Sequence, residues 1–279
     1  LVVGSIAHAK STYDLPEIEY PPPFSRIGSG PSYIIKPDIT HYGGNAGFND
    51  LGNLNVTGVK SFGLDGGIST SVGTSFSTPR ITALAAGIHQ SLQEPFDPLL
   101  IKALIIHSAH YSKNINMEVN EKLKYMGFGK PRNINEILFN TPYEATLILR
   151  DNLAKGEFID IKDFPIPKEL VSNGFYTGQI TVTLVTDPVL DYSQNGEYCQ
   201  SDLQVKLGTY SEKIKRDTTK RNIKNELGRT EAKNILLSNL YSKKIINNVT
   251  SEFANSERML IQYGDKYHPI KNTLLICQK

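Results

Sequence analysis

Three kinds of hydrophobic pattern follow one another along the chain. A short apolar run over Leu1–Ala9, bounded by small residues, predicts a buried strand. Between residues 81 and 139, apolar residues recur at three- and four-residue spacing, the pattern of helices that bury one face. Later segments alternate apolar and polar residues, as Ile180–Leu184 does, which is typical of a strand with one buried face. The pattern therefore changes from mixed α/β to β near Asn140.

Three helices are expected in the first part of the chain. The first follows Ser75 and ends near Gln93. The second begins at Asp97-Pro98, because an aspartate followed by a proline is typical of a helix N-terminus. The third covers about Asn133–Phe139.

Proline and glycine mark the segments between these elements. Pro21–Pro23 exclude a helix or a central strand from the middle of Leu15–Ile39. The end of that stretch, Ser32–Ile39, predicts a short strand that ends where Pro37 lacks a backbone donor. Residues Gly43–Gly73 are rich in Gly, Asn and Ser, so we expect turns and short strands there, a setting that often holds functional sites.

Strand-like segments dominate from residue 141 onward. They predict an all-β sandwich over residues 141–279, after an α/β domain over residues 1–140. The segments are EATLILR, GEFIDIKDF, GQITVTLVTD, DLQVKLGTY, RMLIQYG and NTLLICQ. The basic segment Ser211–Lys233 is expected to be a solvated loop between strands, with a partner-binding patch as the alternative.

Composition and charge exclude little by themselves. The formal net charge is +2 over 279 residues, which offers no argument for a nucleic acid or a membrane surface as partner. No run approaches the roughly 20 apolar residues of a membrane span. Cys199 and Cys277 would fit either one disulfide in an oxidising compartment or two free thiols in a reducing one, so the localisation stays unknown.

The stretch SVGTSFSTPR places hydroxyl residues where the first helix begins. A serine becomes a nucleophile when a base removes its proton and donors stabilise the oxyanion, and the free N–H groups of a helix start are such donors. Ser75 fits this description best, and Gly73 leaves room for a substrate backbone. On these residues alone, ordinary helix capping is the simpler interpretation, with Thr78 as the cap ahead of Pro79.

Longer segments resemble a known family. GTSFSTPRITALAAGI resembles the nucleophile segment of the subtilisin-like serine peptidases, the subtilases, whose motif is Gly-Thr-Ser-x-Ala/Ser-x-Pro before a long apolar helix. LVVGSIA, FSRIGSGPSYIIKPDI, and IKALIIHSA with GFGKPRNINEIL are similar to other family segments in the same order. The resemblance covers Leu1–Phe139 and implies part of a subtilisin-like parallel sheet with helices, ahead of a jelly-roll-like sandwich. It implies that Ser75 is the nucleophile of an endopeptidase, that Thr74 supports the oxyanion region and that Gly73 shapes the turn.

The same resemblance shows what this chain lacks. Subtilases carry their catalytic Asp and His and their oxyanion Asn before the strand that Leu1–Ala7 resembles, which implies that these groups lie upstream and that the isolated chain is inactive. The implied partners are a peptide or protein substrate and the missing N-terminal half, and the edge of a truncated sheet would also allow self-association. No cofactor and no metal are expected in this chain, although a full-length enzyme could bind calcium. Arg80 stands where the family often has a histidine, a change expected to affect only helix packing.

No histidine of this chain is expected to act as the base. His107 falls on an apolar helix face and should pack in or near the core, and His107 with His110 is too small a set for zinc. His41 could approach a substrate, but a backbone-bonded loop histidine is the simpler interpretation. Asp38 is expected to hold its loop.

Two functions from other classes stay open. A non-catalytic subtilase-like scaffold could bind a protein partner through its sandwich and basic loop. A carbohydrate-binding sandwich is disfavoured because the chain contains no tryptophan, although it contains 14 tyrosines.

Overall fold

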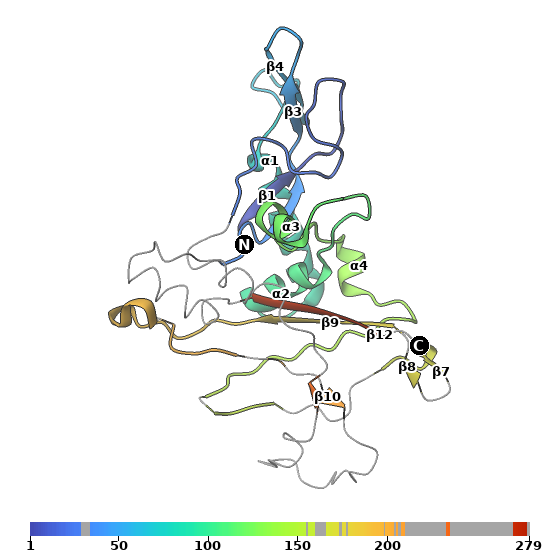
Figure 1. The fold of residues 1–279 in the computed structure, drawn as a ribbon, viewed down its shortest axis with the longest axis vertical. Helices are drawn as coiled ribbons and strands as arrows, with labels where there is room; N and C mark the ends of the chain where they lie inside the picture. Colours follow the sequence, from blue (N-terminus) through green and yellow to red (C-terminus); the bar gives the residue numbers. More distant parts are fainter. Residues whose placement is uncertain are drawn as a thin grey trace.

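The computed structural model describes residues 1–28, 34–154, 156–159, 166–172, 175–176, 178–197, 199–203, 205, 208–209, 233–234 and 270–277. Helices surround a pair of strands near the middle of the molecule, and β-hairpins project at one end (Figure 1). A long antiparallel strand pair lies beyond the helices at the other side.

The central strands are parallel, as expected. β1 (Val3–Ile6) pairs in parallel with β2 (Ile39–Tyr42), with Val3 opposite Ile39. The prediction of a strand over Ser32–Ile39 is wrong for the described residues 34–38, because the strand begins only at Ile39. Pro37 has no N–H to donate, whereas the amides of Asp38 and Ile39 both reach the Val2 carbonyl, at 2.8 and 3.3 Å. Pairing therefore starts directly after the proline.

The three expected helices are present. They are α1 (Thr74–Leu92), α2 (Pro98–Ser108) and α4 (Ile134–Leu138). Asp97 caps α2 by accepting from the Leu99 and Leu100 amides, and Asn133 forms a capping box at the start of α4. A further helix, α3 (Val119–Met126), was not expected, because it buries only Leu123 and Met126. None of the helices in the described residues is long and apolar enough to cross a membrane.

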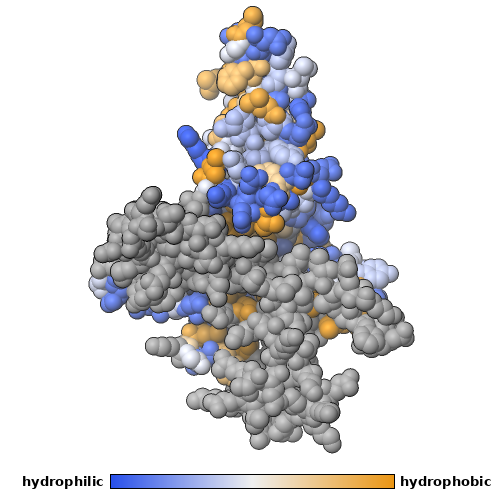
Figure 2. Space-filling model, viewed as in Figure 1, coloured by the Kyte–Doolittle hydropathy of each residue, from blue (hydrophilic) through white to orange (hydrophobic). Residues whose placement is uncertain are grey.

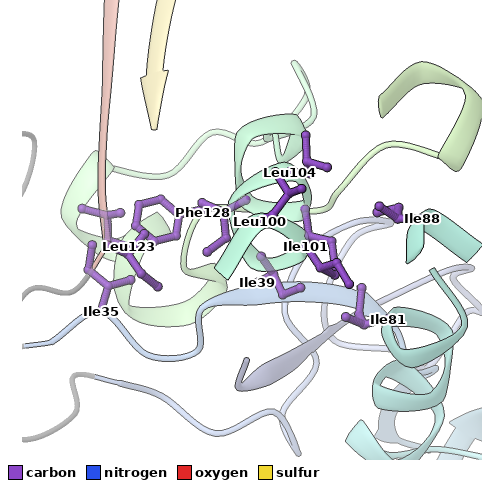
Figure 3. Packing of buried hydrophobic residues seen from close by; sticks show 12 residues of the cluster. Ile35, Ile39, Ile81, Ile88, Leu100, Ile101, Leu104, Leu123 and Phe128 are labelled. Atoms are coloured by element: carbon purple, nitrogen blue, oxygen red, sulfur yellow. The ribbon is translucent and has the colours of Figure 1, made fainter. Parts of the chain in front are cut away.

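One hydrophobic core joins β2, α1 and α2. Figure 3 shows Ile39 beside Ile101 of α2, with Ile81 of α1 nearby and Leu123 and Phe128 on another side. Ile39 and the α2 residues Ile105 and Ile106 are fully buried. Burying an Ile or Leu side chain contributes roughly 1.5–3 kcal/mol, so this core is the main stabilising term of the first part.

Two strands from the chain after residue 140 pack against the same core. β9 (Gly178–Val185) pairs antiparallel with β12 (Ile270–Cys277), which places Ile270 opposite Val185. Both residues pack against the core that contains α2. His107 of α2 also lies on this strand pair, with its Nδ1 2.9 Å from Thr183 Oγ1. The expected strands GQITVTLVTD and NTLLICQ are therefore confirmed, and they contact the helical part directly.

The other strands predicted for the second part differ. EATLILR and the described residues of GEFIDIKDF form no strand. Among the described residues of DLQVKLGTY, β10 (Gly208–Thr209) is the one strand, and it pairs with β11 (Lys233–Asn234). β7 (Val171–Ser172) and β8 (Phe175–Tyr176) form another short pair, and 3₁₀ turns cover Lys168–Leu170 and Tyr192–Glu197. RMLIQYG and most of the basic segment lie outside the described residues. In the part of the chain that is described, every sheet has two strands, so the sandwich stays a prediction.

EATLILR is extended without strand pairing, and an ion pair holds its end. Arg150, its last residue, reaches back to Glu94 at 2.8 Å and to Asp97 at 3.5 Å. Its carboxylate partners lie between α1 and α2, so the chain after residue 140 is attached to the first part by charge as well as by packing.

The Gly43–Gly73 stretch folds into two hairpins, as its composition predicts. β3 (Asn45–Phe48) pairs with β4 (Leu54–Thr57), and β5 (Val59–Phe62) pairs with β6 (Ile68–Ser71). β3 and β4 lie at the far end of the molecule in Figure 1. The second hairpin leads directly into α1.

A charge network connects the loop after β1 to β2. Lys130 Nζ lies 2.6 Å from Glu19 Oε1, donates to Tyr42 Oη at 2.7 Å and stands over the Tyr42 ring. Hydrogen bonds from Lys130, Ser112 and Tyr42 lower the pKa of Glu19 to about 2 from an ordinary value of 4.5. The ionised carboxylate is therefore the form that the fold stabilises.

Replacing Glu19 with glutamine should make stability less dependent on pH. Because the folded chain binds this proton more weakly than the unfolded chain does, the contribution of Glu19 is present above about pH 4.5 and is lost as the pH falls toward 2. Urea unfolding at pH 7 should show a loss of about 1–2 kcal/mol for Glu19→Gln, a discounted value because the pair is partly open to solvent, and a smaller loss at pH 3. Glu17→Gln removes an exposed carboxylate paired with Lys10 and should change stability by less than about 0.5 kcal/mol. Equal losses for both variants at pH 7 would contradict the network's role.

Candidate active site

Ser75 lies at the exposed start of α1. The residue that precedes the helix is Gly73, whose φ of 149° belongs to glycine, and its carbonyl accepts from the Phe76 amide at 3.0 Å. No side chain caps this end of the helix. Among the described residues, no side chain hydrogen-bonds to the first N–H groups of α1, and such groups favour an anion, as expected for a site of oxyanion stabilisation.

The hydroxyl neighbours of Ser75 have different roles from those expected. Thr78 does not cap the helix, because α1 begins at Thr74 and Pro79 lies inside it. Thr78 Oγ1 instead donates to the Thr74 carbonyl at 2.9 Å, one turn earlier. Among the described residues, nothing hydrogen-bonds to Ser75 Oγ. The sequence favours Ser75 among these hydroxyls, and in the structure Ser75 is exposed with its Oγ unbonded among the described residues.

Ser77 ties the start of the helix to both central strands. It is fully buried, and its Oγ lies 3.0 Å from the His41 carbonyl oxygen of β2 and 3.2 Å from Ser5 Oγ of β1. A hydroxyl has one proton, so Ser77 can donate to the carbonyl and accept from Ser5. The amide of Ser5 in turn donates to Ser25 Oγ at 3.0 Å.

Glycine at position 43 lets these elements meet. The Gly73 amide donates to the Gly43 carbonyl at 2.8 Å, and the Gly43 amide donates to Ile6 at 3.1 Å. A Cβ atom at Gly43 would lie 1.9 Å from Ser5 Oγ and 2.7 Å from the Gly73 carbonyl oxygen, distances that no side chain tolerates. The turn that carries Ser75 is therefore held against the ends of β1 and β2.

His41 lies behind this turn and is bonded to the backbone. Its Nδ1 accepts from the Tyr42 amide at 2.8 Å, which confirms the simpler interpretation of this histidine. Burial lowers its pKa to about 4, and the charges of Arg80 and Lys130 add to the effect. The ring is neutral at pH 7, and Arg80 acts on it through charge, so the expectation that Arg80 affects only helix packing is incomplete.

The other titratable candidates, Asp38 and His107, form hydrogen bonds with other groups and not with Ser75. Asp38 is buried and holds its loop, as expected, by accepting from the Val2 amide at 2.6 Å and from Lys36 Nζ at 2.7 Å. Burial lowers the pKa of His107, which is half-buried on α2 as predicted and contacts Thr183 of β9. Across the described ranges, no group of three or more His, Cys, Asp or Glu residues could hold a metal ion.

Replacing Ser77 with alanine should destabilise the fold more than replacing Thr78. Ser77→Ala leaves the His41 carbonyl and the Ser5 hydroxyl buried without this partner, which costs about 1–2 kcal/mol. Thr78→Ala removes an exposed hydroxyl that bonds only within its own helix and should cost less than about 0.5 kcal/mol. Urea unfolding measures both, and equal effects would contradict the structural role given to Ser77.

Comparison with known proteins agrees with the resemblance over the first part. Residues 1–129 match the model of the subtilase family of peptidases. An uncharacterized protein, y4bN, from Sinorhizobium fredii is 27% identical over 193 residues, covering 63% of this chain and 43% of the relative. The chain thus spans less than half of the length of that curated relative. No solved structure gives a significant match. The match over residues 1–129 supports a subtilase-type peptidase at the level of the family.

Proposed function

We propose that this chain carries the nucleophile of a subtilisin-type serine endopeptidase and that Ser75 is that nucleophile. The observation that carries the proposal is the contrast between hydroxyls at the start of α1. Ser77 and Thr78 are engaged in hydrogen bonds, whereas Ser75 is exposed and its Oγ is unbonded among the described residues. The family match over residues 1–129 supports the same reaction class.

The chemistry assigned to this chain is the acylation of Ser75 by a peptide or protein substrate. Ser75 Oγ would attack the carbonyl carbon of the scissile bond, and the N–H groups at the start of α1 would stabilise the resulting oxyanion. Gly73 would leave room for the substrate backbone, since an added Cβ there would meet nothing closer than the Ser75 amide at 3.7 Å. Thr74 would hold the oxyanion region as the next residue of the turn.

The base that activates Ser75 is proposed to come from polypeptide that precedes Leu1. In the described part of the chain, no histidine hydrogen-bonds to Ser75, and His41 uses its Nδ1 to accept from the backbone. A histidine, an aspartate that orients it and an oxyanion asparagine from an N-terminal half would complete the site, as the resemblance implies. Such a half would also pack against the side of the molecule that carries Ser75.

A second candidate is a non-catalytic subtilase-like scaffold. The observation that favours it is the same absence of a hydrogen-bonded base beside Ser75 in the described residues. A gene whose upstream region encodes no catalytic aspartate and histidine segments would support the scaffold over the enzyme.

Peptidase activity should require Ser75 and the preceding polypeptide together. A protein expressed with its upstream coding region should hydrolyse a peptide library, and Ser75→Ala should reduce kcat/KM by roughly 10³-fold or more. Residues 1–279 alone should show no hydrolysis and should not react with a fluorophosphonate, because a serine without a base is a poor nucleophile.

The matched control is Ser71→Ala, which removes another exposed hydroxyl at the end of β6 and should retain full activity. Unchanged hydrolysis in Ser75→Ala would exclude Ser75 as the nucleophile. Rapid fluorophosphonate labelling of Ser75 in residues 1–279 alone would show that the base lies within this chain.

A further inference from the structure

The two hairpins over residues 45–71, which we call the hairpin arm, end in similar tips. The first tip is FNDLGNL over residues 48–54, and the second is FGLDGGI over residues 62–68. Each has a phenylalanine in its first position and a Leu or Ile in its seventh, and these two residues pair across the strands. Each tip also has a leucine in the turn. The arm thus presents a similar set of three apolar residues twice.

These tips are exposed to an unusual degree. Phe62 is 95% exposed, Ile68 is 80% exposed, and the turn residues Leu51 and Leu64 are 84% and 111% exposed. Figure 2 shows hydrophobic residues at and near the projecting end of the molecule, where the arm lies in Figure 1. Single exposed apolar side chains are common in monomeric proteins, whereas a set of this size usually marks an interaction site.

The second hairpin also buries few of its own side chains. All four residues of β6 are exposed, and β5 buries only Val59. An isolated two-stranded hairpin is marginally stable in water and usually needs packing against another surface. A partner on the arm would supply that packing.

The charge of the arm limits what the partner can be. Residues 45–71 contain Asp50, Lys60 and Asp65 as their only Asp, Glu, Lys or Arg residues, so the segment has a formal charge of −1. Nucleic acid and anionic lipid surfaces bind through clusters of Lys and Arg, which this segment lacks. An apolar protein surface with few charges is the matching partner.

A second copy of this chain offers an apolar surface whose area is large enough for a stable dimer. The six apolar side chains of the two tips, at about 150–200 Å² each and largely exposed, present on the order of 800 Å², close to what each partner buries in a standard stable interface. A two-fold dimer needs a self-complementary surface, and two similar tips on each copy provide one. We propose that the hairpin arm is a dimer interface in which the tips of two copies of this chain pack together.

Analytical ultracentrifugation of residues 1–279 over about 0.1–100 µM tests this inference and does not depend on peptidase activity. The expected result is a monomer–dimer equilibrium. Leu64→Glu should weaken dimerisation on the order of 100-fold. In a two-fold dimer both copies of Leu64 are buried, so the substitution places two unpaired carboxylates in the interface. Ile68→Glu, on the strand of the same tip, should do the same.

The matched control is Val189→Glu, which adds the same charge at an exposed apolar residue outside the arm and should leave the dimer unchanged. A monomer at all concentrations would overturn the proposal. So would a dimer that survives both arm variants, because association would then use another surface such as the edge of the β1–β2 pair. A chain that stays monomeric but floats with phosphatidylcholine vesicles, and loses this in Leu64→Glu, would assign the tips to a neutral lipid surface instead.

Discussion

The start of α1 depends on one buried hydroxyl. Ser77 lies between the carbonyl of His41 on β2 and the hydroxyl of Ser5 on β1, so a single side chain joins the helix to both parallel strands. The Gly43–Gly73 backbone hydrogen bond fixes the turn from the other side. Because these contacts are buried, losing them costs the desolvation of each partner. Two residues before Ser77, the exposed Ser75 is held in place, and its own hydroxyl has no hydrogen bond within the described part of the chain.

The core behind this turn supports the strands to which it is attached. Ile39 of β2 and the α2 residues Ile105 and Ile106 are fully buried in one cluster, to which Val185 and Ile270 of the second part also contribute. The residues after 140 therefore add to the same core through β9 and β12, and Arg150 adds ion pairs at the α1–α2 connection. At the other end of the molecule the tips and the second hairpin of the arm bury little, so stability is concentrated around the strands that position Ser75.

Sequence patterns predicted the features that depend on local chemistry. The Asp97-Pro98 cap, the long apolar helix and the alternating strand at Ile180–Leu184 follow from capping and periodicity. Patterns failed where tertiary contacts decide: α3 buries only two residues, and EATLILR was expected to be a strand but pairs with no strand among the described residues. The exposure of Ser75 and the burial of Ser77 could not be predicted from the sequence. Which of two hydroxyl residues at a helix start is buried depends on the strands that pack against that helix. Ser5, a polar residue inside the apolar run LVVGSIA, was the one available signal of a buried polar partner.

The most direct measurement is the site of covalent attachment in an active protein. The chain, expressed with the polypeptide encoded upstream, would be treated with a fluorophosphonate, digested and mapped by tandem mass spectrometry over residues 71–80. The proposed role of Ser75 predicts a stoichiometric adduct on Ser75 and none on Thr74, Ser77 or Thr78. An adduct on another hydroxyl, or an active protein whose Ser75 stays unmodified, would contradict it.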